Sequence, residues 1–242
     1  TKNNINPSLI ESIDEDNNGN IWVGGFNGLW KYDFKSNLLN ETSFDKPIVS
    51  ILVLNNNIIC GTEKGLYNYS ITKNSYTKID VSDNINNIHF IGKINKDILV
   101  GTKNGFVFSL NNFNEKFSFN KIEKEYGFPI KDIIKGNSNN FFVATDGNGI
   151  YELSDQNIIL KHYLQDFNKP NSLSSNGIYD IELDDEGIMW IATYGGGINY
   201  YNFKKLPFIK IQHELNNNNS LSSDFTRSVA KDSKGNLWFG TK

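Results

Sequence analysis

The segment "DSKGNLWFGT" at residues 232–241 repeats a pattern that occurs twice earlier in the chain. "DDEGIMWIAT" occupies residues 184–193, and "DNNGNIWVGG" occupies residues 16–25. Each copy reads Asp-x-x-Gly-x-x-Trp, and copies in register indicate a repeat architecture. The aspartate and glycine are typical of a turn, because a carboxylate accepts backbone N–H groups and glycine adopts positive φ. We expect the tryptophan to pack between neighbouring repeats. The predicted structural residues are Asp16, Gly19, Trp22, Asp184, Gly187, Trp190, Asp232, Gly235 and Trp238.

Weaker copies of the repeat share a Gly or Ala, then a Thr or Gly, then a short loop with glycine and an apolar residue. The second residue of each such pair stands at 25, 62, 102, 145, 193 and 241. Between these points the sequence alternates polar and apolar residues, as in "IYDIEL" from Ile178, which predicts short strands rather than helices. Four strands in a unit of about 40 to 50 residues are typical of a propeller blade.

The sequence therefore predicts an all-β fold, a β-propeller segment of four-stranded blades. About five blades are complete, and a sixth has only its first strands. The single propeller region covers residues 1–242, with blades at approximately 9–46, 47–83, 84–127, 128–171 and 172–219, and an incomplete one at 220–242.

Composition excludes several classes of function. The net charge is −3 and the chain has one arginine, Arg227, so it lacks the clustered cations that phosphate binding requires, and no nucleic-acid partner is expected. Cys60 is the single cysteine, which rules out an internal disulfide and a cysteine-based metal site; it is predicted to fill a buried strand position. No apolar stretch is long enough to span a bilayer, and no export signal is visible at the first residue.

Three enzyme or metal hypotheses arise from short motifs. "DEDNNG" at residues 14–19 begins like a calcium loop, but position twelve is Gly25 instead of a glutamate, so a turn is favoured. The Asp-Gly-Trp turns are similar to the Asp boxes of sialidases, which need several arginines for the substrate carboxylate. A propeller lyase would use a channel histidine, and the candidates are His89, His162 and His213. We therefore expect no metal, no cofactor and no catalytic residue.

The repeat resembles the two-component-regulator propeller repeat. The match is strongest at residues 172–202, "SLSSNGIYDIELDDEGIMWIATYGGGINYYN", and at residues 220–241, "SLSSDFTRSVAKDSKGNLWFGT". The resemblance implies the extracytoplasmic sensor portion of a membrane-anchored signalling protein, in most cases a hybrid two-component histidine kinase, with an oligosaccharide as a typical ligand. Complete sensors have more blades than this chain, so the resemblance predicts a piece of a longer protein, without the kinase and joined to a membrane only through parts absent from this sequence.

The loops between second and third strands are the predicted ligand-binding positions, because loops on a rigid scaffold commonly carry function. Their polar and aromatic side chains suit sugar hydroxyls and ring faces, and are equally the ordinary residues of hairpin tips. The candidates are Phe26, Asn27, Glu63, Lys64, Lys103, Asn104, Asp146, Asn148 and Tyr194.

The expected function is ligand sensing without catalysis. The alternatives are a small propeller lyase or hydrolase and a protein-interaction scaffold. An incomplete sixth blade also exposes a sheet edge, which predicts that the terminal blade pairs with another copy, as a homodimer, or with residues from the N-terminus of the same chain.

Overall fold

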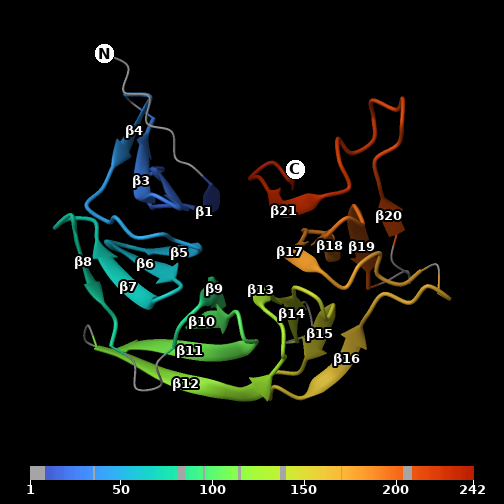
Figure 1. The fold of residues 1–242 in the computed structure, drawn as a ribbon, viewed down its shortest axis with the longest axis horizontal. Helices are drawn as coiled ribbons and strands as arrows, with labels where there is room; N and C mark the ends of the chain where they lie inside the picture. Colours follow the sequence, from blue (N-terminus) through green and yellow to red (C-terminus); the bar gives the residue numbers. More distant parts are fainter. Residues whose placement is uncertain are drawn as a thin grey trace. The chain divides into compact units, whose positions relative to one another are not determined.

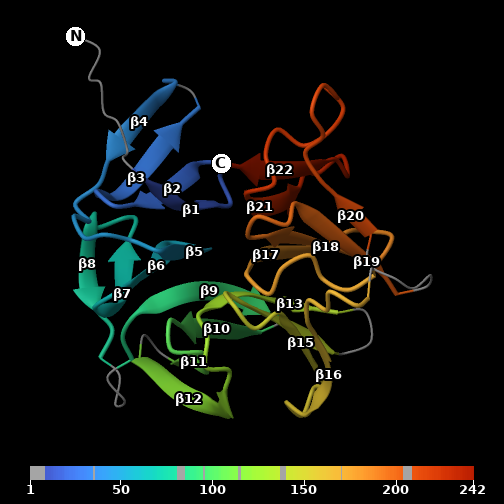
Figure 2. The same ribbon diagram turned by 45° about the vertical axis from the view of Figure 1, so that its right-hand side comes forward.

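The computed structural model describes residues 9–34, 36–80, 85–94, 96–113, 116–136, 140–169, 171–203 and 209–242, and in these ranges every regular element is a β-strand. The strands form five four-stranded sheets and one two-stranded sheet (Figures 1 and 2). In each sheet the spatial order follows the chain order. The predicted all-β propeller fold, with five full blades and the first two strands of a sixth, is confirmed. The predicted boundary at residues 83 and 84 lies outside the described residues.

The chain divides into two compact units, and unit 1 is Thr1–Glu123. It contains blades 1 to 3, which run from blue to green in Figure 1. Blade 1 consists of β1 (Ile10–Glu15), β2 (Ile21–Gly25), β3 (Gly28–Asp33) and β4 (Leu38–Glu41). Blade 2 consists of β5 (Ser50–Leu54), β6 (Asn57–Thr62), β7 (Gly65–Ser70) and β8 (Ser75–Lys78). Blade 3 consists of β9 (Ile88–Ile94), β10 (Asp97–Thr102), β11 (Phe106–Phe113) and β12 (Lys116–Glu125), whose last residues fall in unit 2.

Unit 2 is Lys124–Lys242 and contains blades 4 to 6. Blade 4 consists of β13 (Ile130–Lys135), β14 (Phe141–Thr145), β15 (Ile150–Leu153) and β16 (Ile159–Tyr163). Blade 5 consists of β17 (Ile178–Leu183), β18 (Ile188–Thr193), β19 (Ile198–Asn202) and β20 (Ile209–Ile211). The two-stranded blade 6 consists of β21 (Thr226–Lys231) and β22 (Leu237–Thr241). Within each unit, the first strand of one blade packs against the first strand of the next.

Small residues on the second strands allow successive blades to approach closely. A Cβ on Gly24 would lie 2.7 Å from a side-chain methyl carbon of Ile48, and a Cβ on Gly61 would lie 2.6 Å from the matching carbon of Ile88. The isoleucines of the following blade therefore fill the space that a side chain would need. At this position blade 4 has Ala144 and blade 5 has Ala192, and both alanines are fully buried. The Gly-or-Ala element of the repeat is thus a packing requirement.

A hydrogen bond between first strands joins successive blades. In unit 1, Ser12 Oγ accepts the backbone N–H of Ile51 at 3.1 Å, and Ser50 Oγ accepts that of Ile91 at 3.0 Å. In blades 4 and 5 of unit 2 the same position holds aspartates instead of serines. The resulting contacts are Ile181 N–H to Asp132 Oδ2 at 3.1 Å and Val229 N–H to Asp180 Oδ2 at 2.8 Å. These bonds satisfy first-strand donors that lie outside the sheet ladder.

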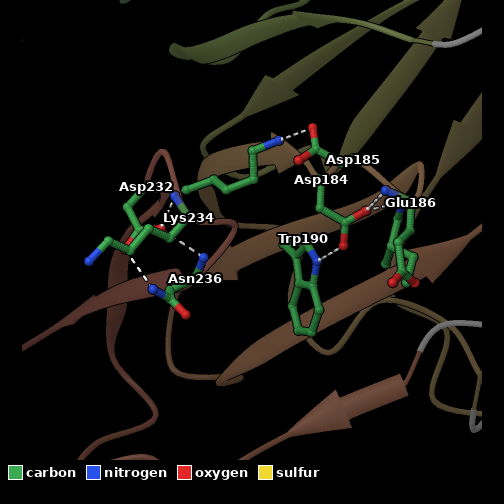
Figure 3. Close-up of polar contacts among 9 residues, drawn as sticks. Asp184, Asp185, Glu186, Trp190, Asp232, Lys234 and Asn236 are labelled. Carbon is green, nitrogen blue, oxygen red and sulfur yellow. Dashed lines mark hydrogen bonds and ion pairs between the residues drawn. The ribbon is translucent and has the colours of Figure 1, made fainter.

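The Asp-x-x-Gly-x-x-Trp motif forms the predicted turn, and its aspartate also holds the tryptophan. Asp184 Oδ1 accepts the backbone N–H groups of Glu186 and Ile188, and Asp184 Oδ2 accepts the indole N–H of Trp190 at 2.8 Å (Figure 3). Gly187 has a φ of +79°, as the turn requires. The copies at Asp16 and Asp232 make the same carboxylate-to-indole bond at 3.0 Å. One side chain therefore closes the turn and orients the ring.

Two of the three motif tryptophans pack against the next blade. The Trp22 ring is 2% exposed and contacts Tyr69 of blade 2 edge-on at 6.0 Å, and Trp190 contacts Phe239 of blade 6 at 5.8 Å. The same packing was expected of Trp238, and this prediction is wrong, because its side chain is 64% exposed. Asp232 still accepts the indole N–H of this exposed ring.

We predict that the free energy of unfolding depends more on Asp16 than on Asp232. Asp16→Ala leaves the Trp22 indole N–H and the turn amides without their acceptor in a site where Asp16 is 7% exposed, which should cost about 3 kcal/mol. Asp232→Ala removes matching bonds at an exposed turn, where water replaces them, so its effect should be clearly smaller. Urea unfolding of both variants measures the difference, and equal losses would contradict the interpretation.

Candidate functional site

Threonines close the loops between second and third strands. Thr193 Oγ1 donates to the carbonyl of Gly197 at 2.7 Å, and Thr145 Oγ1 donates to that of Gly149 at 2.9 Å. The loop after Thr193 is also fastened to blade 6, because Thr193 N–H donates to Thr226 Oγ1 at 2.9 Å. All three threonines are buried. The threonine of the repeat therefore presents the loop tip rigidly, which suits a binding surface.

A β-bulge at the start of several first strands leaves one residue per blade outside the pairing register. The pairing register skips one residue between Ile130 and Asp132, between Ile178 and Asp180, and between Thr226 and Ser228. The skipped residues in unit 2 are Lys131, Tyr179 and Arg227; those in unit 1 include Glu11 and His89. Bulges commonly re-aim side chains next to functional sites. The bulge residues differ in chemistry from blade to blade, whereas their neighbours repeat.

Three aromatic rings form a row across blades 5 and 6 of unit 2. Tyr194, at the tip of the β18–β19 loop, contacts Tyr179 edge-on at 6.0 Å and Phe225 edge-on at 5.6 Å. Tyr194 is 56% exposed and Phe225 is 45% exposed. We call Tyr179, Tyr194 and Phe225 the aromatic row. Adjacent rings with open surface offer apolar area to a ligand, and their hydroxyl groups offer hydrogen bonds.

Charged side chains lie around Tyr179, the ring at one end of the aromatic row. Lys131 Nζ lies 5.1 Å from the centre of the Tyr179 ring, a cation–π contact that crosses from blade 4 to blade 5. The pKa of Tyr179 is raised, first by desolvation and then by the charge of Asp146 and by Tyr194, and Arg227 acts in the opposite direction. The row therefore combines ring surface with two cations and one carboxylate.

Backbone contacts through Gly177 bring two of the predicted ligand residues together. Asp146 forms an isolated β-bridge with Gly177, whose carbonyl accepts the N–H of Tyr194 at 2.8 Å. Asp146 and Tyr194 therefore both contact the backbone of Gly177. Asn148 is not part of this group, because its side chain donates to the Tyr151 hydroxyl and its carbonyl accepts a bond from His162 Nε2 at 2.8 Å.

The predicted ligand residues of unit 1 lie on the corresponding loops of blades 1 to 3. Glu63 and Lys103 are joined through Asn87, whose N–H donates to the Glu63 carbonyl and whose carbonyl accepts the Lys103 N–H. Phe26 is 59% exposed, and its N–H donates to the carbonyl of Leu9. The remaining candidates on these loops are Asn27, Lys64 and Asn104. A role of these residues in ligand binding stays a prediction.

A hollow of about 190 Å³ lies in unit 1 beside Trp22, Lys31, Tyr69 and Asn74. The rings of Trp22 and Tyr69 are each 2% exposed, and Lys31 Nζ lies over the Trp22 ring at 5.6 Å. The Tyr69 hydroxyl already donates to Asn74 Oδ1 at 2.8 Å. The rings at this hollow are therefore covered and their polar groups are paired, unlike the aromatic row.

The histidines proposed for a lyase occupy separate places. His162 stacks on Tyr151 at 3.9 Å, and His213 Nδ1 contacts the carbonyl of Leu221 at 2.7 Å. His89 is the bulge residue of blade 3. Among the described residues, no group of three or more His, Cys, Asp or Glu side chains has a geometry that could hold a metal ion. Cys60 is fully buried, as predicted, and desolvation raises the pKa of its thiol.

Sequence reasoning identified Tyr194 and Asp146 but missed Tyr179, Phe225, Lys131 and Arg227. Tyr179, Lys131 and Arg227 stand at bulges, where the alternation of a strand gives no sign of the extra residue. Phe225 lies immediately before β21, in a segment that the repeat pattern does not mark. One signal was available in the sequence. The same repeat position holds Lys, Tyr and Arg in three successive blades, and such different side chains at one position are not explained by packing.

Comparisons with known proteins agree with this fold. The family model described as "Two component regulator propeller" matches residues 172–195 and 220–242. The extracellular domain of BT4673, a one-component or hybrid two-component system of B. thetaiotaomicron, is 20% identical with a TM-score of 0.80, covering 100% of this chain and 32% of that one. The extracellular domain of the hybrid two-component system BT3049 from the same organism is also 20% identical, with a TM-score of 0.63, covering 96% of this chain and 37% of that one.

PorZ, a surface component of the type-IX secretion system of Porphyromonas gingivalis, is 17% identical with a TM-score of 0.71, covering 95% of this chain and 37% of that one. The chain thus spans about a third of the length of these structures, and at such identities they show the fold alone. No curated protein matches the sequence significantly. The described part of the chain has no helix of the length and apolarity needed to cross a membrane. Two segments of the chain, in blades 5 and 6, thus match the two-component regulator propeller model, and the propeller fold is shared with extracellular domains of hybrid two-component systems.

Proposed function

We propose that the chain is a ligand-sensing propeller on the extracytoplasmic side of a membrane-anchored signalling protein, and that it binds an oligosaccharide along the aromatic row without catalysing a reaction. The family match and the extracellular structural neighbours support the sensing role. The observation that carries the ligand class is the row itself, in which Tyr194 and Phe225 keep about half of their surface exposed.

The chemistry of the row suits a saccharide. The apolar faces of sugar rings pack on aromatic side chains, while sugar hydroxyls pair with polar neighbours such as Asp146 and the tyrosine hydroxyls. The edge-on contacts of Tyr194 with both neighbouring rings fix its orientation, which reduces the entropy lost on binding. A rigid row also suits a sensor, because the free energy of ligand binding is not reduced by the entropy cost of ordering the loop.

We predict that Tyr194→Ala weakens oligosaccharide binding about tenfold or more, which corresponds to about 1.4 kcal/mol, and leaves the unfolding free energy nearly unchanged. The loss follows from removing the central ring of the row. A glycan array identifies a bound oligosaccharide, and titration calorimetry with that compound measures the affinity. Phe167→Ala serves as the control, because Phe167 is a 91% exposed aromatic outside the row. An array without any bound glycan, or equal affinity of the wild type and Tyr194→Ala, would contradict the proposal.

Pairing with a second copy through blade 6 is the proposed partner contact. Its support is the open face of that blade, where Trp238 is 64% exposed although Trp22, at the same repeat position, is covered by the next blade. A second copy that covers Trp238 would supply the missing contact.

For this contact we predict that Trp238→Ser lowers the self-association constant at least tenfold, whereas Leu215→Ser, a change at an 86% exposed loop position, leaves it unchanged. Sedimentation velocity over a concentration series measures both. A wild-type monomer at all concentrations, with no hydrogen-exchange protection in β22, would refute the pairing.

A further inference from the structure

One backbone amide in unit 2 serves two carboxyl groups. The N–H of Ile181 lies 3.1 Å from Asp132 Oδ2, across the boundary between blades 4 and 5, and 3.1 Å from Asp180 Oδ1 within blade 5. The two acceptor oxygens therefore approach the same hydrogen. A single N–H satisfies one carboxylate well, and two negative charges that converge on it repel each other.

The outer oxygens of the two carboxyl groups have donors of their own. Asp132 Oδ1 accepts the N–H of Ile133 at 2.7 Å, and Asp180 Oδ2 accepts that of Val229 at 2.8 Å. The two facing oxygens are thus short of one donor. A proton on one carboxyl group would supply it, because a protonated carboxyl group donates to its ionised neighbour.

The surrounding charges favour that proton. Desolvation, followed by the charge of Asp180, raises the pKa of Asp132 well above its usual range, and desolvation raises that of Asp180 to about 6. Glu182, on the same strand as Asp180, adds negative charge, and its own pKa is raised first by desolvation and then by Asp132. The positive charge of Lys231 on β21 lowers the pKa of Glu182, but Lys231 Nζ is itself paired with Asp185 Oδ1 at 2.6 Å.

At this repeat position, blades 1 and 2 of unit 1 reach the next blade with groups that do not titrate. Ser12 and Ser50 occupy the repeat position of Asp132 and Asp180, and their hydroxyl groups accept the matching amides of the next blade. Joining the blades therefore does not require an acid. The aspartates of unit 2 add sensitivity to protons where a hydroxyl group would suffice.

We propose that Asp132 and Asp180 share one proton and form a pH-sensitive joint between blades 4 and 5. The joint is tight while the proton is bound, and it loosens when the proton leaves and two carboxylates face each other over the Ile181 amide. Each of the two residues keeps part of its surface exposed, although its carboxyl group is desolvated. Lys131 and Tyr179, which immediately precede the two aspartates, meet across the same boundary. The joint thus lies directly beside the aromatic row.

The sign of the pH effect follows from the raised pKa values of the pair. Between the usual aspartate pKa, near 3.8, and about 6 or higher, the folded chain holds a proton that the unfolded chain has released. Stability from this proton is fully present below that range and is lost as the pH rises through it. Each pH unit in this interval changes the opening equilibrium by up to about tenfold for one proton.

Hydrogen exchange at the joint tests the proposal directly, without any ligand. In the wild type, the opening constants of the Ile181 and Val229 amides, corrected for intrinsic exchange rates, should rise at least tenfold from pH 5 to pH 7. In Asp132→Asn/Asp180→Asn, which keeps one acceptor oxygen on each side chain and removes ionisation, they should change less than twofold. Asp14→Asn is the matched control in unit 1, where Asp14 accepts the Glu15 and Val53 amides on separate oxygens; this variant should retain the wild-type pH dependence.

A second measurement keeps the test valid if the double variant does not fold. Carbon-13 titration of the aspartate carboxyl groups in the folded wild type should show the pair losing its two protons in two coupled steps, at least one of them near or above pH 6. Opening constants that stay flat between pH 5 and pH 7, a pH dependence that survives in the double variant, or the absence of a raised aspartate titration would each overturn the joint. Failure of glycan binding would overturn the proposed function alone.

Discussion

Close approach of successive sheets is the constraint on which the other features of this chain depend. The second strands of blades 1 and 2 have no side chain at Gly24 and Gly61, so isoleucines at the start of the next blade pack against the backbone. At that distance, the side chain at Ser12 or Asp132 reaches the amide of the following blade and joins the two sheets. The small residue, the buried isoleucine and the hydrogen bond between blades are therefore parts of one arrangement.

The turn that defines the repeat contributes to the same interface between blades. Asp16 and Asp184 each close a turn and hold an indole N–H, and the ring then packs on the next blade. In two of the three repeats without tryptophan, Ile59 and Phe142 occupy its place and are as buried as Trp22, and in blade 3 the half-buried Leu99 occupies it. What the interface needs is thus a large apolar side chain. The aspartate-to-indole bond adds orientation, and at Trp238 it persists although the ring is exposed.

The proposed binding and regulation depend on residues that the packing leaves free to vary. The bulge places Lys131, Tyr179 and Arg227 outside the ladder, so that their identity does not affect the sheet. The position that follows tolerates serine or aspartate, because either one accepts the amide of the next blade. Variation at these two adjacent positions brings an aromatic row and a titratable pair together without altering the scaffold.

The strands, turns and blade count follow from local patterns, because alternation, turn glycines and the spacing of the repeat are properties of neighbouring residues. Burial of Cys60 and the turn at Asp184 were predictable for the same reason. The aromatic row and the shared amide of Ile181 were not, because each joins residues from different blades. Asp132 and Asp180 stand 48 positions apart, and only the stacking of sheets brings them to one N–H. The exposure of Trp238 likewise depends on which face a neighbouring sheet covers, and the motif around it is the same whether or not that sheet is present.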